Sequence, residues 1–215
     1  MKPIHVMFGI LLCLGLSACR KGQSLTEKQQ EIETGKLDES LAYVAEEIGW
    51  STRVPAGWDV MTKETTKKLQ EQGLKAIEKT AEATVDVSGL KQLLNLRKDR
   101  FNTLLSTIEP YDEAADGPWQ ETHKGVIELI RNSYAQSGVK LGRMKSGVET
   151  INGLEFQTWE VEIMHPSGKS VLGVQKMYGR LIQGYDFAIT MTTNNDKDRE
   201  ALIDLVQLSK FSQRQ

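Results

Sequence analysis

The 215-residue chain is poor in the side chains that most often carry out chemistry, with two cysteines and three histidines. Both cysteines, Cys13 and Cys19, lie at the N-terminus. The chain after position 19 therefore has no thiol for a disulfide, a thiolate metal site or a nucleophile. A fold built from that part depends on the burial of apolar side chains, for which roughly 170 residues are enough.

No excess of one charge is present either, because 27 basic side chains stand against 29 acidic ones. Residues 1–18 contain Lys2 and no acidic residue, so the rest of the chain has 26 basic side chains and a net charge near −3. A mildly acidic surface of mixed sign lacks the basic patch on which nucleic-acid binding depends. We therefore expect no nucleic-acid partner.

The only long apolar run extends from Ile4 to Leu16 and follows the single positive charge of Lys2. This is the layout of an export signal. An uncleaved membrane anchor is the alternative, but the run is shorter than the about 20 apolar residues that a spanning helix needs. It ends at Leu16-Ser17-Ala18-Cys19, which resembles the lipobox of bacterial lipoproteins.

That resemblance implies that residues 1–18 are removed as a signal peptide and that Cys19 receives a diacylglyceryl group. In bacteria with two membranes a third, amide-linked chain is usual. One acyl chain binds a membrane only marginally, whereas several give a lasting anchor. Arg20 takes the place of the aspartate that retains many enterobacterial lipoproteins in the inner membrane, which favours the outer membrane in such a cell. The predicted location is the cell envelope, with the membrane as a partner through the lipid.

Residues 19–40 are polar and are predicted to form a tether, and residues 41–215 a single α+β domain. Strands separated by tight-turn signals such as Asn152-Gly153 and Gln183-Gly184, with helices around them, indicate this class. The predicted strands span residues 46–54, 58–61, 90–97, 101–108, 139–145, 154–164, 170–182 and 185–193. The predicted helices span residues 63–83, 118–136 and 198–208.

The segment Gly49-Trp50-Ser51-Thr52-Arg53-Val54-Pro55-Ala56-Gly57-Trp58 resembles the opening of the Mog1/PsbP-like superfamily. A central helix, a strand meander and a closing helix follow in the order of that family, over roughly residues 43–211. The resemblance implies an antiparallel sheet flanked by helices in an α/β/α sandwich. It implies no activity, because members range from photosystem assembly proteins and a nuclear-transport factor to lipoproteins without assigned function.

Few residues qualify for catalysis or metal binding. His123 lies on the apolar face of the helix at 118–136, either as a base or ligand or as a histidine at the border of the core. We favour the border of the core, because no second ligand stands at metal spacing. His165 precedes a proline and is expected to be a turn residue, and the acidic group Asp112, Glu113 and Asp116 lacks calcium-loop spacing. We expect no catalytic residue, no metal, no cofactor and no enzyme.

The tryptophans offer the remaining candidates. Trp50 and Trp159 fall in strand patterns and are expected in the core. Trp58 follows a turn, where it is either exposed to a partner or, as we favour, closes the end of the core. Trp58, Trp119 and His123 form the candidate binding surface.

The favoured function is a non-catalytic module that binds or assembles another envelope protein. The alternative is a domain that binds a small ligand in a groove between the sheet and the helix at Pro118. A hydrolase is least favoured, because it would need paired titratable groups in a cleft that includes His123.

Replacing Cys19 with alanine is expected to abolish metabolic labelling of the protein by a fatty-acid analogue, since the lipobox cysteine carries the lipid. Labelling is read on the immunoprecipitated protein, with Cys13→Ala as a matched control that should label normally. Continued labelling of the Cys19→Ala protein would contradict the prediction.

Overall fold

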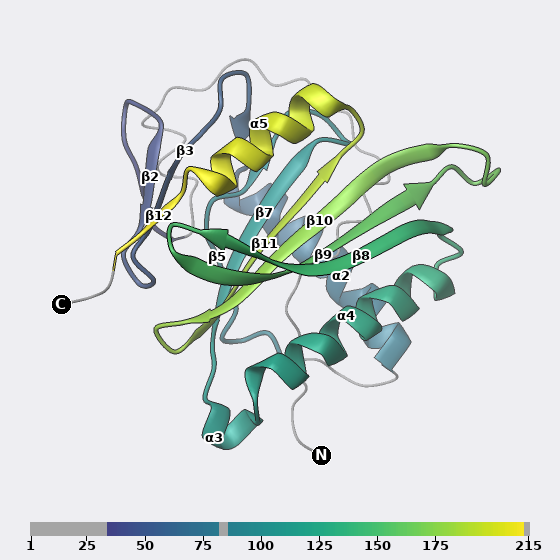
Figure 1. The fold of residues 1–215 in the computed structure, drawn as a ribbon, viewed down its shortest axis with the longest axis horizontal. Coiled ribbons are helices and arrows are strands. Elements are labelled where there is room, and N and C mark those ends of the chain that lie inside the picture. Colours follow the sequence, from purple (N-terminus) through teal and green to yellow (C-terminus); the bar gives the residue numbers. More distant parts are fainter. Residues whose placement is uncertain (1–33, 82–85, 213–215) are drawn as a thin grey trace.

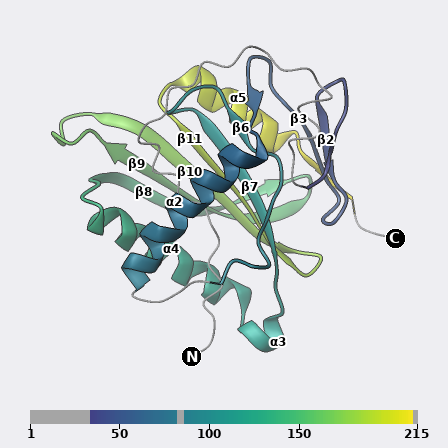
Figure 2. The same cartoon turned by 180° about the vertical axis from the view of Figure 1, so that it is seen from behind.

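In the computed structural model, which describes residues 34–81 and 86–212, a large antiparallel sheet has packed elements on both of its faces (Figures 1 and 2). Helices α2 and α4 cover one face, and helix α5 with a smaller sheet covers the other. We call these the α4 face and the α5 face. The predicted signal peptide, Cys19 and most of the predicted tether lie outside the described residues.

The small sheet has the strand order β1-β2-β3-β12 and is antiparallel throughout. Its strands are β1 (Lys36–Leu37), β2 (Ala42–Ala45), β3 (Trp50–Arg53) and β12 (Lys210–Phe211). The prediction of one strand over residues 46–54 is wrong, because residues 46–49 form the turn between β2 and β3. Gly49 has a φ of 64°, and a Cβ there would lie 2.0 Å from the Ser212 carbonyl oxygen. Since β1 pairs with β2, the folded part also begins before the predicted boundary at residue 41.

The large sheet has the order β4-β6-β7-β11-β10-β9-β8, and β5 pairs with β7. Its strands are β4 (Asp59–Val60), β5 (Lys91–Gln92), β6 (Leu96–Arg97), β7 (Thr103–Pro110), β8 (Leu141–Ile151), β9 (Leu154–Met164), β10 (Val171–Ile182) and β11 (Tyr185–Thr193). The predicted hairpins that join β8 to β11 are confirmed, although β8 is longer than predicted. The prediction of one strand over residues 90–97 is wrong, because these residues form the two short strands β5 and β6 with a break at residues 93–95. The turns Asn152-Gly153 and Gln183-Gly184 have positive φ at both residues, which matches the twist of the strands they join.

The helices are α2 (Lys63–Ala81), α3 (Glu113–Asp116), α4 (Trp119–Gln136) and α5 (Asp196–Gln207). Helix α4 begins at Trp119, one residue after its predicted start, because Pro118 is the N-cap residue. Helix α5 begins two residues before its predicted start, because the side chain of Asn195 accepts a hydrogen bond from the Asp198 N–H and caps the helix. Within the described ranges no helix is both long and apolar enough to cross a membrane.

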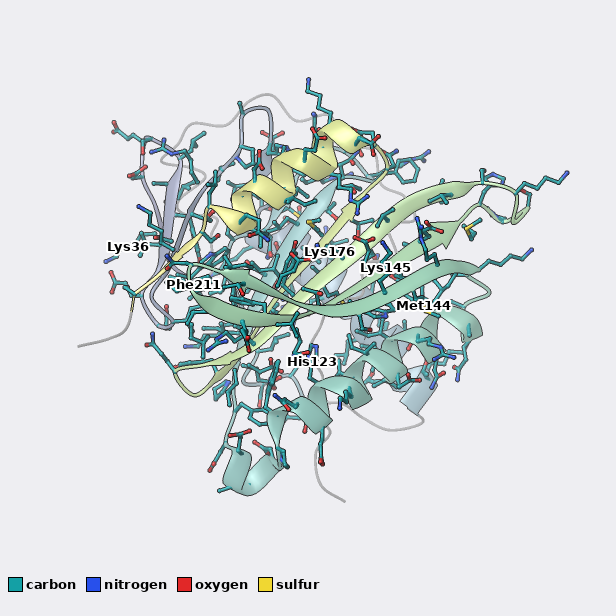
Figure 3. The ribbon with its side chains drawn as sticks, in the orientation of Figure 1. Lys36, His123, Met144, Lys145, Lys176 and Phe211 are labelled. Atoms are coloured by element: carbon teal, nitrogen blue, oxygen red, sulfur yellow. The ribbon has the colours of Figure 1, made fainter. Side chains whose placement is uncertain are left out.

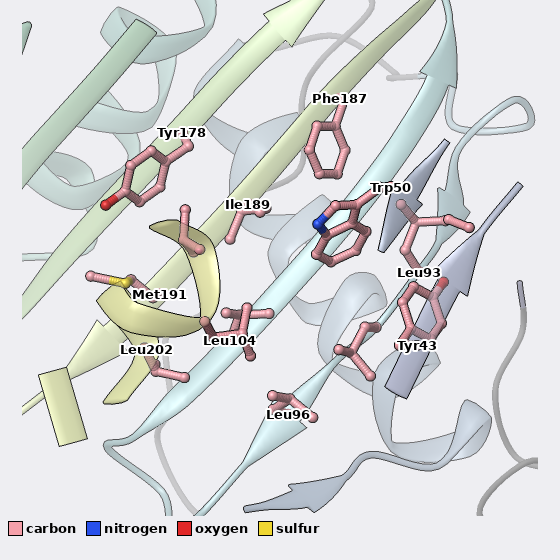
Figure 4. Close-up of a cluster of buried hydrophobic side chains, with 14 of the residues drawn as sticks. Tyr43, Trp50, Leu93, Leu96, Leu104, Tyr178, Phe187, Ile189, Met191 and Leu202 are labelled. Atoms are coloured by element: carbon pink, nitrogen blue, oxygen red, sulfur yellow. The ribbon is translucent and has the colours of Figure 1, made fainter. Parts of the chain in front are cut away.

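The core on the α5 face is organised around Trp50, which is fully buried (Figure 4). Its ring centroid lies 5.4 Å from that of Tyr43 in β2 and 5.2 Å from that of Phe187 in β11. The indole Nε1 donates a hydrogen bond to Ser209 Oγ at 3.0 Å. One side chain therefore joins the small sheet, the large sheet and the segment that follows α5, and the predicted core position of Trp50 is confirmed.

The second core lies on the α4 face. Trp159 and Val161 of β9 point into it, whereas Phe156 of the same strand points to the α5 face. This is the expected alternation of a strand between two layers. Helix α4 contributes Val126, Ile130 and Tyr134, so the predicted apolar stripe of this helix is its contact with the sheet.

Candidate functional site

Trp119 and His123 lie one turn apart at the start of α4, and their rings stack at a centroid distance of 4.8 Å. Both side chains are buried. Trp58 is also buried, but in the core on the α5 face, as the favoured interpretation had it. The three residues therefore do not form the exposed binding surface considered from the sequence. Aromatic side chains stand out in a sequence because they are large and apolar, and the same apolar area favours their burial in the core.

His123 packs its ring directly on the backbone of β10 at Gly179. A Cβ at Gly179 would lie 2.5 Å from Cε1 of the imidazole, so glycine is required there. Within the described structure His123 Nδ1 is buried without a hydrogen-bond partner. Burial lowers the pKa of His123 to about 4, because a charged ring would lose its solvation. The ring is neutral near pH 7 and belongs to the core.

A cleft of about 290 Å³ opens beside Trp119, between the start of α4 and the neighbouring ends of β9 and β10. We call it the α4 cleft. Its lining residues are Glu113, Pro118, Trp119, Gln120, Glu155, Gln157, Arg180 and Leu181. It lies where the sequence predicted a groove at Pro118, and it is lined mostly by polar and charged side chains. The guanidinium of Arg180 donates a hydrogen bond to the Glu155 carbonyl oxygen.

The acidic residues near this cleft cap backbone N–H groups. Glu113 Oε1 accepts a hydrogen bond from the Trp119 N–H at 3.0 Å, and Asp112 Oδ1 accepts one from the Ala114 N–H at 3.0 Å. The predicted acidic loop is therefore partly ordered as the short helix α3. No group of three or more histidine, cysteine, aspartate or glutamate side chains that could hold a metal occurs among the residues described. His165 lies in an exposed turn as predicted, with Nδ1 accepting a hydrogen bond from the Ser167 N–H.

A larger groove of about 660 Å³ lies between α5 and the small sheet. We call it the α5 groove. It is lined by Ala42, Tyr43, Val44, Ser51, Thr52, Arg53, Val54, Pro55, Ala56, Ala201, Asp204, Leu205, Leu208 and Lys210. Two of these side chains are large, apolar and open to solvent: Leu208 is 76 % exposed and Val44 39 % exposed. No local pattern in the sequence marks this groove. Its walls are α5 and the small sheet, and these segments meet only in the folded chain, in which β12 pairs with β3.

The titratable groups between α5 and the large sheet form ion pairs. Lys176 Nζ lies 2.6 Å from Glu149 Oε1, and Arg199 of α5 lies 2.8 Å from Glu160 Oε2. Gln207 near the end of α5 donates a hydrogen bond to the other oxygen of Glu149 at 3.1 Å. The contacts of Arg199 and Gln207 hold α5 on the sheet, and the charges of Lys176, Glu149 and Glu160 are paired within the fold.

The fold is an antiparallel α+β sandwich of the PsbP-like type, as the sequence predicted. The solution structure of cyanobacterial PsbP (CyanoP) from Synechocystis sp. PCC 6803 matches 80 % of this chain and 91 % of its own, with a TM-score of 0.51. Sequence identity is 13 %, so the likeness concerns the fold alone. No protein-family model and no curated protein matches the sequence.

Replacing His123 with leucine is expected to flatten the pH dependence of stability. The pKa of His123 is depressed in the folded state, so its neutral form stabilises the fold fully above pH 6.5, and this contribution is lost as the pH falls towards 4. The wild-type free energy of unfolding should therefore drop by up to about 3 kcal/mol more than that of His123→Leu over this range.

Denaturant titrations at pH 7 and pH 4 measure this difference. His165→Leu, which removes an exposed imidazole, controls for the loss of a histidine. Parallel pH profiles of the wild type and His123→Leu would show that the ring has no depressed pKa.

Proposed function

We propose that the protein is a lipid-anchored, non-catalytic module that binds another protein of the cell envelope through the α5 groove. The observation that carries this proposal is the exposure of two large apolar side chains, Leu208 and Val44, among the residues that line the groove. Single exposed apolar side chains are ordinary on protein surfaces. A groove whose lining includes two exposed large apolar side chains has the features of an interaction site.

The chemistry of the groove indicates the kind of segment that would bind. Its walls include the small apolar residues Ala56 and Ala201, which leave room for a side chain of the partner. Arg53 and Lys210 line it as cations, against the single acidic side chain of Asp204. We infer that the groove takes a segment with an apolar side chain that inserts beside Leu208 and with a carboxylate nearby.

The position of the groove agrees with an anchored protein. The small sheet that forms one wall also contains β1, which lies near the C-terminal end of the predicted tether. Sixteen residues lie between Cys19 and Lys36, and an extended chain over this interval reaches at most roughly 60 Å. A tether of this reach would hold the groove close to the membrane to which the lipid attaches.

Replacing Leu208 with aspartate is expected to abolish crosslinking of the anchored protein to its envelope partner in intact cells. The new carboxylate would have to be desolvated in the contact with the partner and would meet the partner's own carboxylate. Leu172→Asp is the matched control, because Leu172 is an exposed leucine outside the groove.

The readout is the set of proteins recovered with the crosslinked wild type but not with Cys19→Ala. Loss of one partner from Leu208→Asp and its retention by Leu172→Asp is the expected result. Equal recovery by both variants would place the partner elsewhere on the surface.

The α4 cleft favours a second candidate function, the binding of a small polar ligand. Its volume of about 290 Å³ lies near the lower end of the range for small-molecule sites. Arg180, Glu113 and the amides of Gln120 and Gln157 give it both donors and acceptors. These groups suit a ligand of the size of an amino acid or a monosaccharide.

Gln120→Trp, which fills the cleft, should remove any co-purifying small molecule detected by native mass spectrometry of the wild-type protein. Gln136→Trp places the same side chain at an exposed position in the last turn of α4 and should retain the molecule. If the wild type shows no such adduct, or if Gln120→Trp retains it, the ligand-binding candidate fails.

A further inference from the structure

Strand β8 forms one edge of the large sheet, and in the described structure it pairs with β9 alone. It is 11 residues long, and residues 143–148 are all exposed. Met144 is 42 % and Val148 52 % exposed, and Met144 and Lys145 both project from this part of the strand in Figure 3. A long edge with exposed apolar side chains is a template for pairing with another strand.

The register of the hairpin determines which backbone groups face outward. The turn Asn152-Gly153 is closed by the pair Ile151 and Leu154, and the pairs of an antiparallel ladder alternate from there. The even-numbered residues from Met144 to Thr150 therefore direct their N–H and C=O groups away from β9. Their side chains share the α4 face with Trp159, which is paired with Ser146.

We propose that β8 pairs with β8 of a second copy of this chain, antiparallel and with the twofold axis at Ser146. In this register Met144 of each copy lies opposite Val148 of the other, so the two exposed apolar side chains of the strand cover each other. Ser146 lies opposite itself, and two hydroxyls can exchange a hydrogen bond. Each residue whose N–H and C=O groups point away from β9 then lies opposite a residue of the second copy whose N–H and C=O groups point toward it.

The opposite face of the strand is complementary in charge. Lys145 and Glu149 share this α5 face, since they are paired with Glu160 and Phe156 of β9. About the same axis, Lys145 of one copy lies diagonally across from Glu149 of the other, within reach of a long side chain. Arg143 is brought opposite the same glutamate. Within each copy Glu149 already lies 2.6 Å from Lys176 and accepts a hydrogen bond from Gln207, and Arg143 lies 2.8 Å from Glu162. The register therefore brings no like charges together on this face, and the apolar pair on the other face carries the contact.

Neighbouring registers lose this match. A shift of the axis to Gly147 places Met144 opposite Thr150 and Val148 opposite Ser146, which separates the apolar pair. A shift to Lys145 places the two lysines opposite each other, and like charges directly opposite are destabilising. The irregular pairing between Leu141 and Met144 limits the regular edge on that side, so the ladder of the dimer is short.

The test places a cysteine on the proposed twofold axis. Ser146→Cys in the otherwise unchanged, anchored protein should give a disulfide-linked species of twice the mass when intact cells are oxidised with copper phenanthroline. The Cα atoms of opposite residues in an antiparallel pair lie within disulfide range. Thr150→Cys is the matched control on the same strand and face, since its two copies would lie roughly 27 Å apart along the ladder. It should remain a single chain.

A second variant tests the apolar pair. Val148→Asp in the Ser146→Cys background should abolish the linked species, because it sets a carboxylate against Met144 of the second copy. Labelling of the introduced cysteine by a maleimide should persist in this variant and shows that the strand is present and accessible. Leu208→Asp should leave the linked species unchanged, because no residue of β8 lines the α5 groove.

Three results would overturn the proposal. One is a Ser146→Cys protein that reacts with maleimide but forms no linked species. Another is equal linkage through Thr150→Cys, which would indicate random collision in the membrane. The third is linkage that survives Val148→Asp. Each of these leaves the proposed function of the α5 groove standing, since that function requires only one copy.

Discussion

The indole of Trp50 makes the contact on which the rest of the molecule depends. It touches Tyr43 of the small sheet and Phe187 of the large sheet, and it donates a hydrogen bond to Ser209 after α5. Truncation of a buried tryptophan typically costs about 3–5 kcal/mol, a large share of the roughly 5–15 kcal/mol that stabilises a domain. The small sheet has short strands, so its position follows from this contact more than from its backbone ladder. The α5 groove exists because Trp50 holds its two walls together.

The elements predicted correctly are those whose signal is local. Asn152-Gly153 specifies a hairpin by its positive φ angles, and the apolar stripe of residues 118–136 specifies a helix by its period. The errors fall in the small sheet, where β12 is defined by pairing with β3 across most of the chain. A strand of two residues has no periodicity to detect. The turn at residues 46–49 resembles a strand in the sequence because the apolar Ile48 comes just before β3, which begins at Trp50.

The candidate sites also divide into those that a local pattern indicates and those that only the tertiary fold creates. Trp58, Trp119 and His123 were selected as conspicuous aromatic residues, and all three are buried, because such residues contribute most to a core. The α4 cleft was predicted because Pro118 marks the start of a helix that must leave a border with the sheet. The α5 groove could not be predicted, since Val44 and Leu208 come to line one groove only through the tertiary fold. Whether an apolar side chain is exposed depends on how the whole chain folds and not on its neighbours in the sequence.

The pairing proposed for β8 also explains why this edge combines apolar residues with features that restrict association. Lys145 and the irregular pairing near Gly142 protect an edge against open-ended addition of strands. A twofold contact uses each β8 once and closes, because the same patch serves both copies. The opposite edge of the large sheet is the two-residue strand β4, which is too short to continue the ladder. Under the proposed lipid anchoring, two copies in one membrane would meet at a raised effective concentration, so a short ladder that would be weak in solution would suffice there. The pair would then present two α5 grooves to the envelope, and a partner with two matching segments would bind with avidity that neither groove supplies alone.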